Sequence, residues 1–316
     1  MSQKPRISIV TPCYNEEDNV EELYQRISAT IATIPAYDFV LLFIDNHSSD
    51  GTVARIKALA AKDGRVRLIV NTRNFGHIRS PHHGILEGGG VATVYLASDL
   101  QDPPELIPEF IRHWEEGFKV VYAAKPNINA SAAYAFLRKI YYGVLDRVSE
   151  VPLVRNVTGF GIYDREVIDR VRRIGDPYPY MRGLICELGY STKLITYVEP
   201  RRKRGISKNN IYTLYDIAML GLVSHSKLPL RIASFFGFVL GCLSLLAAIT
   251  YLVLKLLFWD TFPIGIAPLM IGIFFLFGML FLFIGLLGEY IAVIHTYAQR
   301  RPIVVEQERV NFDKED

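Results

Sequence analysis

The chain has 316 residues, of which 50% are hydrophobic and only 21% are charged, and its formal net charge at pH 7 is +3. This length favours one large domain with an appendage, and so small a net charge gives no reason to expect nucleic acid as a partner. Three scattered cysteines without a CxxC pair argue against a disulfide framework or a zinc site and indicate reduced thiols in the cytosol.

Short apolar runs alternate with amphipathic stretches from Arg6 to about Tyr197. We expect strands in RISIVTPCYN, FVLLFIDN, VRLIVNT and VATVYLAS, and helices in EEDNVEELYQRISATIATI, DGTVARIKALAAKDG and SPHHGILEGGG. This alternation predicts an α/β fold with a mostly parallel sheet and helices on both faces. The strands are continuous apolar runs, as expected when both faces of a sheet are covered.

Polar loops follow four of the predicted strands. They are Thr11–Glu16, Asp45–Gly51, Arg73–Gly76 and Ser98–Asp102. Because ligands of such sheets bind beyond the carboxyl ends of the strands, these loops predict a binding site. The sequence has neither GxGxxG nor GxxxxGK[ST], so nucleotide phosphates would need another source of positive charge. A divalent cation held by carboxylates is the obvious candidate.

The stretch SDLQDPPEL supports two interpretations. Asp99 and Asp102 follow an apolar strand, where carboxylates could hold a metal ion. Alternatively, Asp102 caps a helix that has Pro103 and Pro104 in its first turn. The local sequence does not decide between the two.

Histidines and cysteines offer no second site by their spacing. Adjacent residues on a helix point in different directions, so His82 and His83 make a poor ligand pair, and no zinc-finger spacing occurs. We interpret these two, together with His47 and His77, as surface or loop residues. Cys13 lies in the first polar loop, but the sequence places no histidine beside it.

Two long segments near the C-terminus lack charged residues, Ile232–Leu254 and Thr261–Gly288. Each exceeds the roughly 20 residues needed to cross a bilayer. Arginines and lysines flank the pair on both outer sides, which predicts a two-helix transmembrane hairpin with both ends in the cytoplasm. Glycines within the spans would allow close helix contacts and leave a homo-oligomer open.

The motifs SIVTPCYNEEDNV, FIDNHSSDGT, RNFGH, SDLQDPPELI, YMRGL and RGISK occur in this order along the chain. They resemble those of family 2 glycosyltransferases that act on polyisoprenyl phosphates, which include bactoprenol glucosyltransferases and dolichol-phosphate mannose synthases. The resemblance covers nearly the whole chain, and SHSKLPLRIAS before the hairpin is most similar to the bactoprenol branch.

This resemblance implies a GT-A fold and an inverting transfer of one sugar from a nucleotide-sugar to undecaprenyl or another polyisoprenyl phosphate. The reaction would take place at the cytoplasmic face of the membrane and serve glycan or lipopolysaccharide modification. UDP-glucose is the expected donor, with UDP-N-acetylhexosamines or GDP-mannose as alternatives. The expected organisation is a GT-A domain over residues 1–200, a basic amphipathic segment over 201–229, two spans over 230–295 and a cytoplasmic tail over 296–316.

Site residues follow from the same resemblance. Asp99 and Gln101 are expected at the reacting centre, where Asp99, with Asp102 as a candidate second ligand, would hold Mg²⁺ or Mn²⁺. The expected donor-nucleotide residues are Pro12, Tyr14, Asn15, Glu16, Asp45, Arg73 and Ser98.

Residues for the acceptor phosphate are expected among cations close to the bilayer. They are Arg138, Lys139, Arg202, Arg204, Ser207 and Lys208. The run Arg201–Arg204 could equally attract anionic lipids and set the topology. Residues Asn210–Val223 have apolar positions at near-helical spacing, which fits an interfacial helix or an ordinary core helix.

The chain departs from the family pattern at three places. Ala97 replaces the first acid of the usual metal motif, Asn46 replaces an acid of the second loop, and TGFGIYD replaces the usual GDFRL. These changes leave open a degenerate member that binds its ligands without turnover. Loss of a catalytic base matters less for a phosphate acceptor, because its second pKa of about 6 leaves it largely dianionic at neutral pH. A processive synthase is disfavoured, since QxxRW is absent and the spans are too few to form a channel.

Overall fold

The computed structural model describes residues 4–125, 157–177, 179, 181–198, 228–258, 266–299 and 301–312. The chain divides into two compact units. The first, here the sheet unit, combines the N-terminal part of the chain with the residues from Arg300 onward, and the second, here the helical unit, is centred on Tyr215–Gln299.

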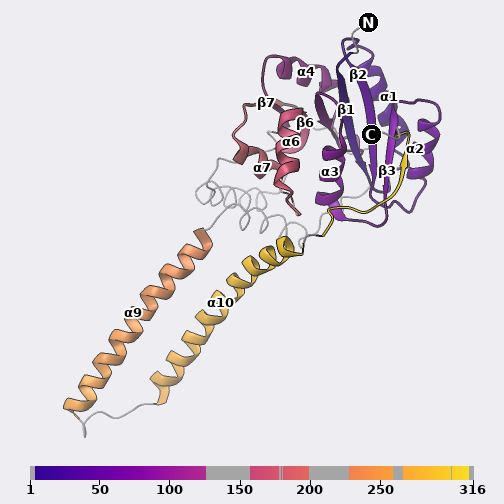
Figure 1. Ribbon diagram of the computed structural model, residues 1–316. Coiled ribbons are helices and arrows are strands. Elements are labelled where there is room, and N and C mark those ends of the chain that lie inside the picture. Colours follow the sequence, from indigo (N-terminus) through magenta and orange to yellow (C-terminus); the bar gives the residue numbers. More distant parts are fainter. Residues whose placement is uncertain are drawn as a thin grey trace. The chain divides into compact units, whose positions relative to one another are not determined.

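The sheet unit contains one eight-stranded sheet with flanking helices (Figure 1). Its strands are β1 (Arg6–Cys13), β2 (Asp38–Asp45), β3 (Val66–Asn71), β4 (Ala92–Tyr95), β5 (Val120–Ala124), β6 (Val157–Asp164), β7 (Thr192–Thr196) and β8 (Glu306–Val310). Its helices are α1 (Val20–Ile31), α2 (Thr52–Ala60), α3 (Gly76–Glu87), the short 3₁₀ helix η1 (Pro104–Leu106), α4 (Ile107–Glu115), α6 (Arg165–Ile174) and α7 (Met181–Leu188).

The strand order is β7-β5-β6-β4-β1-β2-β3-β8. Strands β1, β2, β3 and β4 pair in parallel, as do β5 and β7. Strand β6 runs antiparallel to β4 and β5, and β8 runs antiparallel to β3. The four predicted strands are therefore confirmed as the parallel centre of the sheet. The two antiparallel strands have no counterpart in the sequence analysis.

Helices cover both faces of the sheet, as its continuous apolar strands predict. Buried residues of α1, α2 and α4, such as Leu23, Ile56 and Phe110, share one large core with β1 and β2. On the other face, Ile85 of α3 and Val167 of α6 pack with β5 and β6. Strand β2 shows this most clearly, because Asp38 and Asp45 at its ends bound a continuous apolar run.

The C-terminal residues complete the sheet instead of forming a separate tail. Leu68 of β3 stands opposite Val310, and Asn71 stands opposite Glu306. This differs from the expected organisation, in which the GT-A domain ended at residue 200 and residues 296–316 were a tail. The physical reason is that β3 would otherwise be an edge with unpaired backbone groups.

The helical unit contains α9 (Leu228–Leu257) and α10 (Ile266–Ala298), of 30 and 33 residues. Among the described residues, Phe275–Ala298 of α10 is long and apolar enough to cross a membrane, with a mean hydropathy of 2.2. In α9 the stretch Ala233–Leu243 is apolar but shorter. The described part of the chain thus contains one candidate span where the sequence predicted two.

Gly90, in the turn before β4, provides a test of the fold. Its φ of +89° is one that L-residues rarely adopt, and an added Cβ would overlap the carbonyl oxygen of Arg6. We predict that Gly90→Ala destabilises the protein by about 1–3 kcal/mol from backbone strain alone. Neighbouring Gly89 has open space at its Cβ position, so Gly89→Ala is the matched control and should shift stability by less than about 0.5 kcal/mol. Denaturant unfolding of both variants in detergent checks this, and equal stabilities would contradict it.

Candidate active site

A cavity of about 360 Å³ lies at the carboxyl ends of the parallel strands. Loops after β1, β2, β3 and β4 and the first turns of α3 surround it. It is lined by Pro12, Cys13, Tyr14, Glu16, Asn46, Asn74, Gly76, His77, Ser80, Pro81, Tyr95, Ala97, Ser98 and Asp99. All four polar loops identified in the sequence contribute to this lining or to its immediate support, which makes this cavity the candidate active site.

A second cavity of the same volume, about 360 Å³, lies at the amino ends of the strands and contains five arginines. Three of these are neutralised by neighbours: Arg165 and Arg172 bind Asp169, and Arg309 binds Glu87. None of the four polar loops lines this cavity. Packing between α3, α6 and β8 therefore accounts for these three arginines.

The loops after β1 and β2 hold one another in place. The Asp45 carboxylate accepts hydrogen bonds from the backbone N–H of Ser48 at 2.9 Å and from its hydroxyl at 2.5 Å. The Ser48 hydroxyl oxygen accepts the N–H of Asn15, whose φ is +57°. Burial raises the pKa of Asp45, and the bonds from Ser48 oppose that rise. Neither Asn15 nor Asp45 lines the cavity; both support the loop that presents Tyr14 and Glu16 to it.

The loop after β4 carries Ser98 and Asp99 to the cavity, beside Pro12. The Ser98 hydroxyl donates to the carbonyl oxygen of Pro12 at 2.9 Å, which ties this loop to the one after β1. One Asp99 oxygen accepts the backbone N–H of Gln101 at 3.2 Å. Gln101 supports Asp99 through its backbone and does not itself line the cavity.

Asp102 lies behind the cavity, and the structure contradicts its expected role as a helix cap. Its side chain is buried and accepts the backbone N–H of Ala97 at 3.1 Å and the hydroxyl of Tyr197 at 2.9 Å. The Lys125 ammonium lies 3.8 Å away. Burial raises the pKa of Asp102, and Lys125 opposes that rise. The helical turn begins at Pro104 without a side-chain cap, so the capping interpretation is wrong. As Asp102 does not line the cavity, its geometry gives no support for the second metal ligand.

Asn46 is the centre of a hydrogen-bond network at the cavity wall. Its amide nitrogen donates to the side-chain oxygen of Asn74 at 2.9 Å and to the carbonyl oxygen of Gly76 at 3.2 Å. Its amide oxygen accepts the N–H of Phe75 at 2.9 Å and the side-chain N–H of Asn71 at 3.2 Å. A carboxylate here would lose the two donor bonds, because it can only accept. Asn46 thus has a defined role in holding residues 74–76.

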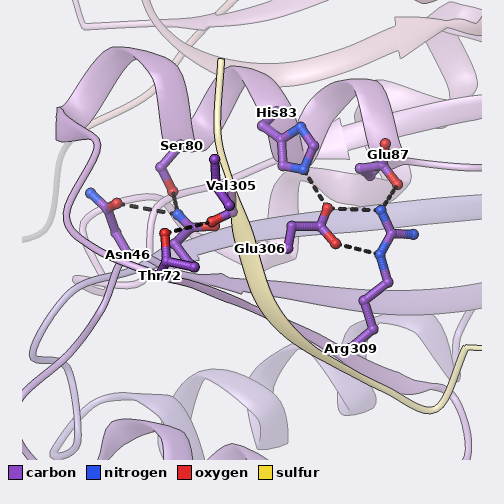
Figure 2. Close-up of polar contacts among 9 residues, drawn as sticks. Asn46, Thr72, Ser80, His83, Glu87, Val305, Glu306 and Arg309 are labelled. Atoms are coloured by element: carbon purple, nitrogen blue, oxygen red, sulfur yellow. Dashed lines mark hydrogen bonds and ion pairs between the residues drawn. The ribbon is translucent and has the colours of Figure 1, made fainter. Parts of the chain in front are cut away.

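The network continues from Asn46 through Asn71 to Ser80 of α3, and Figure 2 shows Asn46 and Ser80 at its two ends. The Asn71 amide donates to the Ser80 hydroxyl at 3.0 Å, and Ser80 lines the cavity together with His77 and Pro81. Sequence analysis missed these contributions because it began the helix at Ser80, whereas α3 begins at Gly76. The RNFGH motif, which ends at His77, was the sequence feature that pointed to this part of the site.

The interpretation of the histidines as surface or loop residues is correct for His47 and His77, which are exposed, and wrong for His82. His82 is buried in α3, and burial lowers its pKa to about 4, so it is neutral at pH 7. His83, on the same helix, binds the Glu306 carboxylate at 2.6 Å. His77 belongs to the first turn of α3 and lines the cavity. His47 lies in the loop after β2 with a φ of +66°.

The remaining predicted residues lie away from the cavity or outside the described residues. The Arg73 guanidinium lies 4.0 Å from the centre of the Phe75 ring and donates to the Asn74 carbonyl oxygen. It does not line the cavity. The six acceptor-phosphate residues lie outside the described residues, as does the segment Asn210–Val223. They are Arg138, Lys139, Arg202, Arg204, Ser207 and Lys208.

Glu16 and Asp99 are the carboxylates that line the cavity. The part of the chain that the structure describes contains no group of three or more His, Cys, Asp or Glu side chains placed to hold a metal ion. A complete protein cage is not needed for Mg²⁺, which is usually bound by one or two carboxylates with substrate phosphates and water. The donor set therefore fits a cation that binds together with a diphosphate.

Comparison with known proteins identifies the family. Residues 8–172, more than half of the chain, match the family described as Glycosyl transferase family 2. The chain belongs to that family. The glycosyltransferase YkcC of Bacillus subtilis is 31% identical over 317 residues, which cover 99% of this chain and 97% of the relative. The bactoprenol glucosyl transferase of Shigella phage SfV is 31% identical over 301 residues, which cover 94% and 96%.

These similarities make the protein a glycosyltransferase with a GT-A-like α/β fold. Among solved structures, it is similar to the mannosyltransferase PcManGT from Pyrobaculum calidifontis in complex with GDP-Man and Mn²⁺. The TM-score is 0.44 at 15% identity, and the match covers 71% of this chain and 62% of that one.

The Asn46 network yields a prediction for Asn46→Asp. At neutral pH the new carboxylate faces the oxygens of Asn74 and Gly76, so we expect a loss of about 1–3 kcal/mol of stability. These contacts raise the folded-state pKa of the new carboxyl above its unfolded value of about 3.9. The loss is therefore complete above the raised pKa and diminishes as the pH is lowered through it. Denaturant unfolding at pH 7.5 and pH 5 checks this, and a variant as stable as the wild type at pH 7.5 would refute it.

Proposed function

We propose that this family 2 glycosyltransferase transfers a single sugar, with inversion, from a nucleotide-sugar to undecaprenyl or another polyisoprenyl phosphate. The observation that carries the proposal is a cavity with Asp99 at the strand ends, in a chain that also contains a long apolar helix. Relatives named bactoprenol glucosyl transferase, 31% identical over 94% of the chain, support the lipid acceptor. The same relatives make UDP-glucose the first donor to test, ahead of UDP-N-acetylhexosamines and GDP-mannose.

The donor would lie along the carboxyl edge of the sheet. In this proposal Pro12, Tyr14 and Glu16 contact the base and ribose, and Ser98 and Asp99 lie at the diphosphate. Three of the expected site residues do not line the cavity and would act indirectly, by holding its loops in place. They are Asn15, Asp45 and Gln101. Arg73 would need to turn from Phe75 to reach the diphosphate. Asp102 is left out of the proposed metal site.

Asp99 would hold the divalent cation, with Glu16 as the other carboxylate available in the cavity. When bound, Mg²⁺ or Mn²⁺ supplies Lewis-acid stabilisation of the leaving diphosphate. The backbone N–H of Gln101 donates to one Asp99 oxygen and so helps to fix this carboxylate at the cavity. The hydrogen bond from Ser98 to the Pro12 carbonyl oxygen holds the Asp99 loop against the loop after β1, which would bind the nucleotide.

The acceptor phosphate requires positioning more than deprotonation. A phosphomonoester with a second pKa of about 6 is largely dianionic at neutral pH and is already a nucleophile. Holding it near the anomeric carbon would supply most of the rate. In this proposal the holding cations are Arg138, Lys139, Arg202 and Arg204, assisted by Ser207 and Lys208.

The pairing of β8 with β3 bears on membrane topology. These strands belong to one sheet, although the helical unit lies between them in sequence. A folded sheet lies on one side of a bilayer, because unpaired backbone groups are not tolerated in its apolar core. The chain between them must therefore cross an even number of times. Since α10 contains a candidate span, we propose that α9 is the second span and that the sheet unit is cytoplasmic.

A second candidate function is binding of a nucleotide-sugar or lipid without turnover. Ala97 favours it, because this position offers only a backbone N–H, which Asp102 takes up. The cavity nevertheless keeps one carboxylate at the place where a diphosphate would lie. Turnover is therefore the leading proposal.

We predict metal-dependent transfer of radiolabelled sugar to undecaprenyl phosphate by the purified protein in detergent. The donors to compare are UDP-glucose, UDP-N-acetylglucosamine and GDP-mannose, with Mn²⁺, Mg²⁺ or EDTA. Asp99→Asn should lower transfer by at least 100-fold, since it removes the charge that would hold the cation. The control is Asp38→Asn, because Asp38 is exposed at the amino end of β2 and should leave transfer unchanged. Nucleotide binding without transfer would favour the binding-only function, and transfer indifferent to EDTA would remove the metal from the proposal.

We further predict that the connection between α9 and α10 is exposed on the outer side of the membrane. A cysteine placed by Thr261→Cys should react with a membrane-impermeant maleimide in intact cells. A cysteine placed by Lys314→Cys, beyond β8, should react only after the cells are permeabilised. Equal labelling of both positions in intact cells would overturn the two-span topology.

A further inference from the structure

Strand β8 does more than cover the edge of the sheet, because its first residue reaches across β3 to α3. The ladder begins beside the candidate site, where the N–H and hydroxyl of Thr72 both donate to the carbonyl oxygen of Val305. The next residue, Glu306, accepts from His83 of α3 at 2.6 Å. Figure 2 shows both contacts, that of Thr72 with Val305 and that of Glu306 with His83.

A second link lies further along β8. Arg309 donates to Glu306 at 2.5 Å and to Glu87, at the end of α3, at 2.7 Å. Figure 2 shows Arg309 between the two carboxylates. His83, Glu306, Arg309 and Glu87 thus form a continuous chain of alternating donors and acceptors, here called the β8–α3 clamp.

The residues of α3 that meet β3 and β8 form one stripe. Ser80, His83 and Glu87 are spaced three and four residues apart, so they lie on the same face of the helix. Ser80 is held by Asn71 of β3 and lines the candidate site, whereas His83 and Glu87 are held by β8. A shift of α3 along or about its axis would break the clamp and move Ser80 together with it.

We propose that Glu306 is a positioning residue for the nucleotide-sugar: through His83 it fixes α3, and α3 sets one wall of the donor cavity. This inference rests on the proposed function, since it assigns a role in the same site. Glu306 lies on β8 and does not line the cavity, so it acts through the helix and not by contact. The wall in question consists of His77, Ser80 and Pro81.

The chain provides a matched control two residues away. Glu308 lies on the same strand and pairs with Lys57 of α2 at 2.6 Å. This pair is as short as the one between Glu306 and His83, but α2 contributes no residue to the cavity. A general loss of charge on β8, or a loosening of the strand, would affect Glu306→Gln and Glu308→Gln alike.

The test compares Glu306→Gln, Glu308→Gln and His83→Gln in the full-length protein in detergent. The probes are UDP and GDP with Mn²⁺, with their Kd measured by calorimetry, followed by the KM and kcat of transfer. We expect Glu306→Gln to raise the Kd and the donor KM about three- to tenfold with kcat within twofold of the wild type. Glu308→Gln should leave all three within twofold. His83→Gln should reproduce the effect, and combining it with Glu306→Gln should add nothing further.

The outcomes separate this inference from the proposed function. Should the wild type bind neither nucleotide, the proposed donor site fails. Should the wild type bind while Glu306→Gln and His83→Gln keep its Kd and KM, the positioning role is overturned. An equal rise for Glu308→Gln would also overturn it, because the effect would then belong to the strand as a whole. If Glu306→Gln does not fold, His83→Gln decides, since it removes the same bond from the helix side.

Discussion

The antiparallel pairing between β3 and β8 is the constraint on which the sheet and the position of α3 at the candidate site depend. It returns the chain to the sheet after the helical unit and satisfies the backbone groups of an edge that parallel pairing leaves open. It also places Glu306 and Arg309 against α3, so that a helix of the candidate site is held by a strand from the far end of the sequence. Strand β8 therefore completes the sheet and also holds α3, the helix that forms one wall of the candidate site.

The loops around the cavity are held in place mainly by hydrogen bonds between uncharged groups. Asn46 uses both donors and both acceptor positions of its amide on residues 71–76, and Ser98 joins two loops with a neutral hydroxyl. The buried carboxylates of Asp45 and Asp102 do not line the cavity but accept backbone N–H groups of the loops that surround it. Asp99 is thus one of few negative charges at the place proposed for the diphosphate. A site lined by so few carboxylates suits a substrate that itself brings most of the negative charge.

Local patterns in the sequence were sufficient for the central strands and the first helices. Their apolar runs are continuous, and each strand ends in a polar loop, so both the layers and the site edge follow from the physical chemistry of burial. The roles of individual residues within these loops could not be predicted from local sequence patterns. Asp102 resembles a helix cap because Pro103 and Pro104 succeed it, but a tertiary partner, Tyr197, takes its carboxylate. The strand role of Glu306–Val310 was equally hidden, because its charged residues resemble a solvated tail and pair only with elements distant in sequence.

The late position of β8 in the sequence has a consequence for biosynthesis. Ribosomes complete β3 long before β8, and the two apolar helices are made in between. Until β8 emerges, the β3 edge stays open and α3 lacks its outer clamp, so the nascent sheet unit exposes a surface prone to wrong pairing. Closure of the sheet can occur only after α10 has been synthesised, because β8 follows α10 in the chain. Completion of the sheet unit is thereby ordered after synthesis of the two long helices, by chain connectivity alone.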